Sequence, residues 1–346
     1  MPFETVVRKT IEYLAMPSVV GYEDFFLSKL KEDFENLGIE VIAHDDLLEV
    51  RGKKPNSAII TAHTDRHGLI SLGNGQYAYA AQHVKESKYG EPNRHSKSEL
   101  ESIKQRFINE YVFAYDPTSG EKRTCGKIEA CAASQKDGTS MFTLDSSSTV
   151  KKNVPIAYAR TAERKGQYLK GQIDNTVSLG VIYVLFQNGF QGTALLTTEE
   201  EIGYSWHHLV HWLKSHAIET QNLIVLDTSP YNDADPVKEG QVTLRTRDKS
   251  ASFNESLVYQ IQERSRHLDI PTQIKDKKML ASGLPIDKLG STELGKLILN
   301  SNQRWSGATV QIPTLSYHTS YETTSQDCVE SYYALLQNIL IEDPVF

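Results

Sequence analysis

The sequence has few cysteines, no long apolar run and no excess of positive charge. Its three cysteines, Cys125, Cys131 and Cys328, are an odd number without CxxC spacing, which indicates neither a disulfide framework nor a cysteine-based zinc site. The longest apolar stretch, VSLGVIYVLF, is too short to cross a bilayer. The net charge of -7 argues against nucleic acid, whose protein partners usually carry a basic patch. We therefore expect neither a nucleic-acid nor a membrane partner.

The N-terminal stretch, MPFETVVRKTIEYLAMPS, lacks the uninterrupted apolar core of a secretory signal. Together with the cysteine usage, this predicts a reduced, cytoplasmic compartment. The remaining composition is ordinary, because 346 residues with 39% hydrophobic and 23% charged side chains are typical of a globular protein with one large or two modest domains.

Strand-like and helix-like segments alternate near both ends of the chain. Residues 21–38 carry apolar side chains at helical spacing, and the β-rich runs IEVIAHD and SAIITAH follow them. Later strands are predicted at TALLTT, NLIVLD and ATVQIP, and ATVQIP is taken as the last strand. A final helix is predicted from about Gln326 to Ile341, with Ser325 as its N-cap. This alternation predicts an α/β sheet with helices on its faces.

The middle of the chain has a different character. Strand-like pieces such as YVFAYD, KIEACAAS and VPIAYAR are joined by turn signals such as DPTSGE, and one helix is predicted through SELESIKQRFINEY. We therefore predict a discontinuous α/β domain of residues 1–70 and 165–346. Residues 71–164 would form an inserted β-rich domain.

Polar residues stand where several predicted strands end. These residues are His63 after SAIITA, Glu200 and Glu201 after TALLTTE, Asp227 after NLIVL, His318 after ATVQIPTLSY, and Asp174 after a strand predicted at GQYLKGQI. The glutamate run alone would indicate a solvated acidic turn, but ligands collect at the carboxyl ends of strands in open α/β sheets. Mixed histidine and carboxylate ligands suit Zn, Co or Mn and not Ca. Five ligands suffice for two ions if one carboxylate bridges them.

Seven motifs carry a resemblance to a known family. They are PSVVGYEDFFLSKL, IITAHTDRHGL, GQIDN, TTEEEIG, VLDTSP, GSTELG and YHTSYETTSQDCVE. In this order, and near this spacing, they resemble the dinuclear metallo-aminopeptidases of metallopeptidase family 42, which include glutamyl, deblocking and tetrahedral aminopeptidases. The resemblance covers roughly residues 10–70 and 165–340. It implies a three-layer α/β/α zinc-peptidase fold with a mixed sheet and a barrel-like inserted domain. It also implies cleavage of N-terminal residues from peptides, and a homo-oligomer from dimer to dodecamer with contacts in the inserted domain.

The resemblance also implies the site residues. One divalent ion would be held by His63 and Asp227 and a second by Glu201 and His318, with Asp174 bridging them; zinc is the expected metal, with cobalt or manganese as alternatives. Asp65 would orient His63 and raise its basicity. Glu200 would be the general base that takes a proton from water.

Some motifs depart from the family pattern. The family's HMDEIG is HTDRHG here, which places Arg66 and His67 beside the predicted site. We hypothesise that they make its rim more positive and favour acidic substrates. The stretch GSTELG, similar to the family's GGTDAG, adds Thr292 and Glu293 as candidates for substrate binding.

Two other functions are compatible with the sequence. The first is a carboxypeptidase or N-acyl amino acid deacylase of related fold, because the same ligands serve that chemistry. The second is a catalytically inactive scaffold or binding subunit, which the changed HTDRHG and DNTVS motifs would suit. The retained ligands and Glu200 favour an enzyme.

Overall fold

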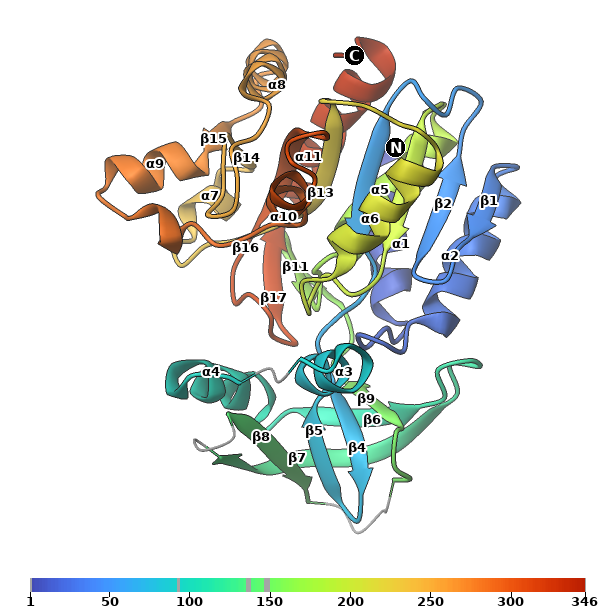
Figure 1. Ribbon diagram of the computed structural model, residues 1–346, viewed down its shortest axis with the longest axis vertical. Helices are drawn as coiled ribbons and strands as arrows, with labels where there is room; N and C mark the ends of the chain where they lie inside the picture. Colours follow the sequence, from blue (N-terminus) through green and yellow to red (C-terminus); the bar gives the residue numbers. More distant parts are fainter. Residues whose placement is uncertain (1, 92–93, 135–137, 146–149, 346) are drawn as a thin grey trace.

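The computed structural model describes residues 2–91, 94–134, 138–145 and 150–345 (Figure 1). The helices are α1 (Pro2–Leu14), α2 (Asp24–Asn36), α3 (Ala80–Tyr89), α4 (Lys97–Phe107), α5 (Thr176–Gln187), α6 (Ser205–Ser215), α7 (Asp235–Lys238), α8 (Glu255–His267), α9 (Lys275–Ala281), α10 (Glu293–Asn300) and α11 (Gln326–Gln337), with a 3-10 turn at Ile286–Lys288 and a π-helical turn at Asn338–Glu342. The strands are β1 (Glu40–Ala43), β2 (Leu47–Arg51), β3 (Ile59–His63), β4 (Leu69–Gly73), β5 (Gln76–Tyr79), β6 (Tyr111–Tyr115), β7 (Lys122–Ser134), β8 (Thr139–Leu144), β9 (Pro155–Tyr158), β10 (Glu163–Lys165), β11 (Tyr168–Gly171), β12 (Thr193–Thr197), β13 (Leu223–Pro230), β14 (Val242–Arg245), β15 (Thr272–Ile274), β16 (Gly307–Thr314) and β17 (Glu322–Ser325). None of the described helices combines the length and apolarity needed to cross a membrane.

An eight-stranded mixed sheet forms the centre of the larger part of the molecule. Its strand order is β1-β2-β12-β3-β13-β16-β14-β15. The four central strands β12, β3, β13 and β16 are mutually parallel, while β2 and β14 pair antiparallel with the two outer members of that group. The carboxyl ends of the four parallel strands therefore meet at one edge of the sheet.

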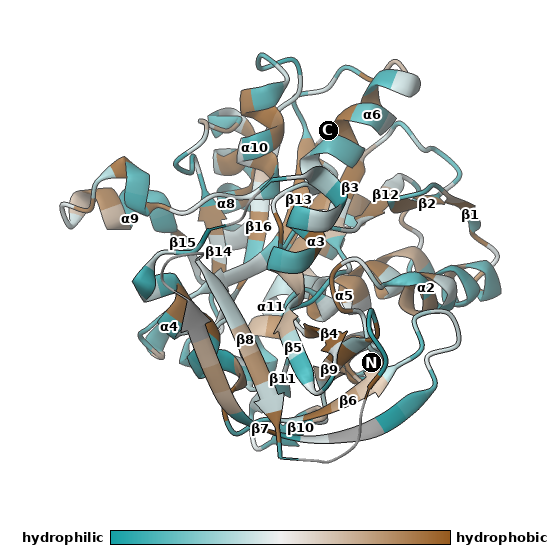
Figure 2. Cartoon of the chain, turned by 60° about the horizontal axis from the view of Figure 1, so that its bottom comes forward, coloured by the Kyte–Doolittle hydropathy of each residue, from teal (hydrophilic) through white to brown (hydrophobic). Residues whose placement is uncertain are grey.

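Helices cover both faces of this sheet (Figure 1). Apolar side chains of α1, α2, α5, α8 and α11 share one core with the sheet. On the other face, α6 and α10 pack around Trp212 and Trp305. Figure 2 shows hydrophobic residues on central strands such as β12 and hydrophilic residues along the outer side of α2. The predicted α/β class with helices on both faces is confirmed.

A closed barrel lies below the sheet in Figure 1. Its strands follow the order β4-β5-β8-β7-β6-β9, from Leu69 to Tyr158 along the chain. Its core contains the stacked rings of Phe107 and Tyr158, whose centroids are 5.0 Å apart. Phe107 comes from α4, and that helix is fixed by a capping box between Ser96 and Glu99.

The structure corrects two details of the strand assignment. ATVQIP is not the last strand, because β17 follows it before α11 begins after its N-cap Ser325. The strand predicted at GQYLKGQI is β11, but it lies in a separate three-stranded sheet of order β10-β11-β17. Such short strands give too few residues for a period-2 pattern to stand out. Of the cysteines, Cys328 is buried and Cys131 half-buried, both as free thiols, and the side chain of Cys125 lies outside the described part of the chain.

Candidate metal centre

The carboxyl ends of three parallel strands bring the predicted ligands together. His63 is the last residue of β3, Asp227 lies in the adjacent β13, and Glu200 and Glu201 follow β12. Asp174 comes from the loop between β11 and α5, and His318 from the loop between β16 and β17. The six residues therefore reach one rim from five different segments of the chain.

One group of potential ligands surrounds the imidazole of His63. Its Nε2 lies 3.2 Å from Asp174 Oδ1 and 3.6 Å from Asp227 Oδ1. Its Nδ1 lies 3.1 Å from the carbonyl oxygen of Asp65 and 3.6 Å from Asp65 Oδ1. Burial opposes the charged imidazole, but the bonds to these three aspartates raise the pKa of His63 well above its usual value. In this arrangement Nδ1 is held by Asp65, and Nε2 faces the other two carboxylates.

A second group lies around Glu201. Its Oε2 is 3.4 Å from His318 Nε2 and 2.8 Å from His67 Nε2. His318 Nε2 is also 3.6 Å from Asp174 Oδ2, so Asp174 turns one oxygen toward each group. Burial and the nearby Arg106 lower the pKa of His318 to about 3, which leaves a neutral imidazole that can bind a cation.

Asp65 holds the two adjacent glutamates as well as His63. Its Oδ1 accepts the backbone N–H of Glu200 and its Oδ2 accepts that of Glu201, both at 3.0 Å. In the described part of the chain, no donor lies within hydrogen-bond distance of the Glu200 carboxylate, which faces the cleft. Burial, joined by the charge of Asp227, raises the pKa of Glu200 to about 8. Glu199 points elsewhere, toward Lys88 and His208.

The residues present fit divalent cations. Asp174 Oδ2 is buried and has no hydrogen-bond donor in the described structure, although a buried carboxylate oxygen normally has one. Burial and the charge of Asp174 also raise the pKa of Glu201 well above its usual value. Carboxylates that are buried side by side repel one another unless a positive charge lies between them. A donor set of both oxygen and nitrogen atoms suits Zn, Co or Mn.

Glu322 is a residue of the site that the sequence did not reveal. It is buried, and its two oxygens accept the backbone N–H groups of His318 at 2.6 Å and of Asp174 at 2.9 Å. It therefore joins the two loops that carry these ligands. The available signal was its place inside the motif YHTSYETTSQDCVE, four residues after His318 and at the start of the short strand β17.

We expect Glu322→Gln to weaken metal binding about 10- to 100-fold, which is the effect of losing a group that positions a metal ligand. A glutamine has only one acceptor oxygen and would direct its NH₂ group at one of the two backbone N–H donors. Chelator competition measures the affinity. The exposed Glu330→Gln on α11 is the control, and equal affinity in both variants would contradict this role for Glu322.

A cleft of about 620 Å³ opens at Glu200 and Glu201, and part of its wall is basic. Arg245 and Lys275 line it, and they are only 5% and 7% exposed. Lys275 Nζ donates to Ser229 Oγ at 2.9 Å, and Arg245 Nε donates to Gln311 Oε1 at 2.9 Å. Across the described residues, no carboxylate forms an ion pair with either cation. Burial and the charge of Arg245 lower the pKa of Lys275 to about 7.

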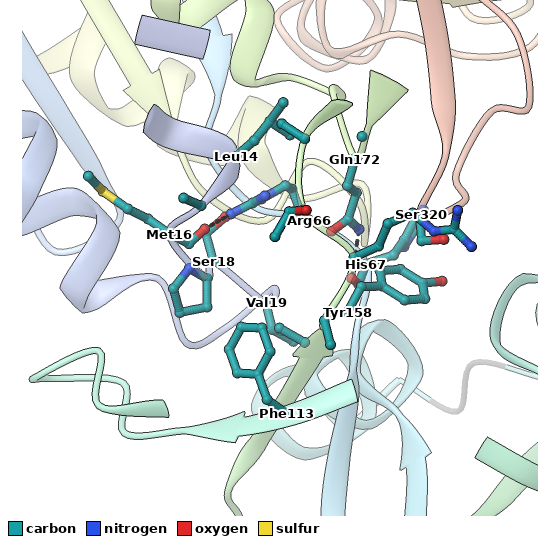
Figure 3. A pocket seen from close by; sticks show the side chains of 18 of the residues that line it. Leu14, Met16, Ser18, Val19, Arg66, His67, Phe113, Tyr158, Gln172 and Ser320 are labelled. Carbon is teal, nitrogen blue, oxygen red and sulfur yellow. Dashed lines mark hydrogen bonds between the residues drawn. The ribbon is translucent and has the colours of Figure 1, made fainter. Parts of the chain in front are cut away.

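The four residues predicted to bind substrate lie in different places. Arg66 points away from the cleft and donates hydrogen bonds to Ser18 and to the carbonyl of Met16. Arg66 and His67 both line a cavity of about 80 Å³, in which His67 lies near Tyr158 and Ser320 (Figure 3). Arg66 therefore does not form the positive rim that we hypothesised. Thr292 lines the cleft and caps α10, while the carboxylate of Glu293 is turned away and accepts the hydroxyls of Thr61 and Thr197.

Comparison with known proteins gives a family match and a group of similar folds. Residues 155–335 match the M42 glutamyl aminopeptidase family. No curated protein matches the chain in sequence. Among solved structures, an aminopeptidase from the archaeon Desulfurococcus kamchatkensis superimposes with a TM-score of 0.74 at 13% identity, covering 98% of this chain and 95% of that one.

Two further structures have the same fold. A TET aminopeptidase from a marine-sediment Thaumarchaeota archaeon has a TM-score of 0.69 and 18% identity, over 98% of this chain and 96% of that one. The TET1 peptidase of Pyrococcus horikoshii, which can assemble into a tetrahedron or a large octahedral shell, has a TM-score of 0.70 and 14% identity, over 97% and 99%. At these identities the likeness establishes the fold over nearly the whole chain.

Proposed function

The chain belongs to the M42 glutamyl aminopeptidase family and is a metal-dependent aminopeptidase, and from this premise we propose a two-ion mechanism with Glu200 as its general base. His63 and Asp227 would hold one ion, Glu201 and His318 the other, and Asp174 both. The observation that carries the proposal is the position of Asp174, whose two oxygens face the two histidines on opposite sides.

Each residue then has a defined task. When bound, the ions supply Lewis-acid polarisation of the scissile carbonyl and favour the deprotonation of water. Asp65 keeps Nε2 of His63 directed at the site and fixes the backbone of the glutamate pair. Glu200 takes a proton from the attacking water and delivers it to the leaving amine. Of the two adjacent glutamates that follow β12, Glu201 would thus be a metal ligand and Glu200 the general base.

Metal content and peptide cleavage, measured together, test this mechanism. Metal-depleted protein is reloaded with Zn²⁺, and bound metal is counted by mass spectrometry. Activity is measured on peptides with a free N-terminal amine and on N-acylated amino acids. Two ions per chain with cleavage of the free-amine peptides alone support the proposal. Cleavage of acylated amino acids alone would favour the deacylase, and one ion at full activity would refute the two-ion arrangement.

The basic wall of the cleft supports a preference for peptides with an acidic N-terminal residue. Arg245 and Lys275 are buried cations without a carboxylate partner among the described residues, and such charges are costly until an anion reaches them. A substrate side chain ending in a carboxylate would supply this partner. Lys275 and Arg245 take over the role that we had assigned to Arg66.

We expect Lys275→Met to raise KM for N-terminal glutamyl peptides about tenfold or more, because a hydrogen bond to a charged group contributes about 1.5–3 kcal/mol. KM for leucyl peptides should stay within about twofold, which is below 0.5 kcal/mol. The exposed cleft lysine Lys288, changed to Met, is the matched control. Equal effects on glutamyl and leucyl substrates would show that Lys275 does not determine substrate preference.

The same lysine predicts a pH dependence of substrate preference. Its lowered pKa of about 7 means that Lys275 is charged below that pH and loses its proton above it. KM for glutamyl peptides should therefore rise as the pH increases from 6 to 8.5, with no such rise for leucyl peptides. Lys275→Met should abolish the difference between the two profiles.

We also propose that the protein is a homo-oligomer, since the TET1 peptidase with the same fold assembles into large shells. The barrel of residues 71–164 would carry contacts between copies. Its surface exposes Tyr111 by 63% and Met141 by 38%, which are large apolar groups to leave in water. The cytoplasmic compartment predicted from the cysteine usage remains part of this proposal.

A further inference from the structure

We propose that His67 is an additional metal ligand, beside Glu201 and His318, for the ion on that side of the site. This inference rests on the two-ion arrangement proposed above. With Asp174, it gives that ion four protein ligands, whereas the ion at His63 has three. The related motif HMDEIG has isoleucine at this position, so the extra ligand would be a feature of this sequence.

The geometry around Glu201 carries the proposal. His67 Nε2 lies 2.8 Å from Glu201 Oε2, closer than His318 Nε2 at 3.4 Å. The rings of His67 and His318 meet edge to face, with centroids 4.1 Å apart. One ligand atom from each of the three residues lies within 4.8 Å of the other two, which is the spacing of atoms that share an ion. His67 is therefore as well placed for this ion as the two ligands that the family motif identifies.

The other nitrogen of His67 is held as in a metal-binding histidine. Nδ1 lies 2.7 Å from the hydroxyl oxygen of Tyr79, which accepts a hydrogen bond from Arg106 Nη1 at 3.1 Å. When Nδ1–H donates to this oxygen, the lone pair of Nε2 is free and faces Glu201. Ligating histidines usually donate their second ring nitrogen to an oxygen in this way. Arg106 Nη1 also approaches Nε2, but only to 3.5 Å.

The barrel thereby takes part in the metal centre. Tyr79 ends β5 and Arg106 belongs to α4, and both elements lie outside the sheet that carries the other ligands. The ring of His67 is only 3% exposed, so it has little freedom to turn away from Glu201. The sequence places His67 beside the site, but only the packing of the barrel against it fixes the orientation of the ring.

The ion at Glu201 would have four protein ligands and the ion at His63 three, so we expect the two ions to bind with unequal affinity. Sites closed by four protein ligands hold zinc tightly, whereas catalytic sites keep a position open. The ion at Glu201 should therefore be retained and the ion at His63 should exchange more readily. Removal of metal by a chelator should proceed in two phases of equal amplitude in the wild-type protein.

A cysteine in place of His67 tests direct contact with the metal. A thiolate bound to Co²⁺ produces a charge-transfer absorption in the near ultraviolet, which a thiol that does not touch the ion cannot produce. The full-length protein is loaded with Co²⁺ as the wild type and as three variants. His318→Cys is the positive control, and Ser320→Cys, in the cavity behind His67, is the negative control. We expect the band in His67→Cys and His318→Cys and not in Ser320→Cys.

The result separates this inference from the proposed function. Two Co²⁺ ions per chain with no band in His67→Cys, while His318→Cys shows one, would overturn the role of His67 and leave the two-ion site intact. Fewer than two ions in the wild type would instead refute the two-ion site.

A second variant covers the case in which His67→Cys does not fold. His67→Gln should turn the slow phase of metal release into a fast one. It should lower the affinity for one ion by more than about 100-fold, whereas losing a residue that only orients a ligand typically lowers it about 10- to 100-fold. Tyr79→Phe should stay within that smaller range. Unchanged biphasic release in His67→Gln would also overturn the proposal.

Discussion

Replacing Glu200 by glutamine is expected to lower kcat by about 10²–10⁴-fold, the usual contribution of a general base. Glutamine has nearly the same shape but cannot accept the proton of the attacking water. Metal content should remain that of the wild type, because Glu200 belongs to neither group of potential ligands and its backbone bond to Asp65 is kept. The measurement is kcat on glutamyl and leucyl peptides together with bound metal per chain.

Glu199 provides a matched control one residue away. Its carboxylate is held by Lys88, Tyr89 and His208 outside the metal centre. Burial alone would raise the pKa of Glu199, but these hydrogen bonds outweigh burial and lower the pKa to about 2. We expect Glu199→Gln to reduce thermal stability while kcat stays within about threefold, less than 1 kcal/mol in the barrier. If Glu200→Gln retained kcat within tenfold, Glu200 would not be the base.

The second large effect is expected from Asp174→Asn, which should prevent the binding of both ions and abolish cleavage. Its two oxygens face His63 at 3.2 Å and His318 at 3.6 Å, so it is the one described carboxylate that reaches both histidines. Asparagine offers a single weaker oxygen and directs an NH₂ group at the second ion. Equilibrium dialysis with Zn²⁺ and peptide assays measure the two losses.

Asp227→Asn is the comparison, because the described structure pairs Asp227 with His63 and not with His318. It should lose one ion and keep the other. Thermal melting provides an independent readout, since an ion that binds only the folded state raises Tm. The increase in Tm on adding Zn²⁺ should vanish in Asp174→Asn and persist in part in Asp227→Asn. Retention of both ions by Asp174→Asn would exclude it as the bridge.

The sequence by itself determined the features that depend on chain neighbours. Apolar periodicity predicted α2, and short apolar runs predicted the buried strands β3, β12 and β13. The alternation of such elements predicted the α/β class. Polar residues directly after such strands, including His63 and the pair Glu200 and Glu201, are predicted to share one rim because parallel strands end together. The motif order then indicated the family. All these signals are local patterns or their sequence along the chain.

Only the tertiary structure decided which way neighbouring side chains turn. Arg66 and His67 are adjacent, yet one reaches toward Ser18 of the N-terminal segment and the other toward Glu201. The ring of His67 is held by Tyr79 of the barrel, a contact that Arg66 does not share. The tertiary structure also decided which cations line the cleft. Lys275 and Arg245 lie in segments whose sequences carry no motif, and they meet through the sheet that joins them.

Glu322 is another residue whose role the sequence alone did not reveal. The four residues of β17 are too few for a periodic pattern, and its role depends on two backbone N–H groups that lie 148 and 4 residues away along the chain. The bond to Asp174 forms only when the two loops are brought together by the pairing of β11 with β17. The ligand types were therefore readable from the sequence, whereas their support, their neighbours and the charge of the cleft depend on long-range contacts that no local pattern encodes.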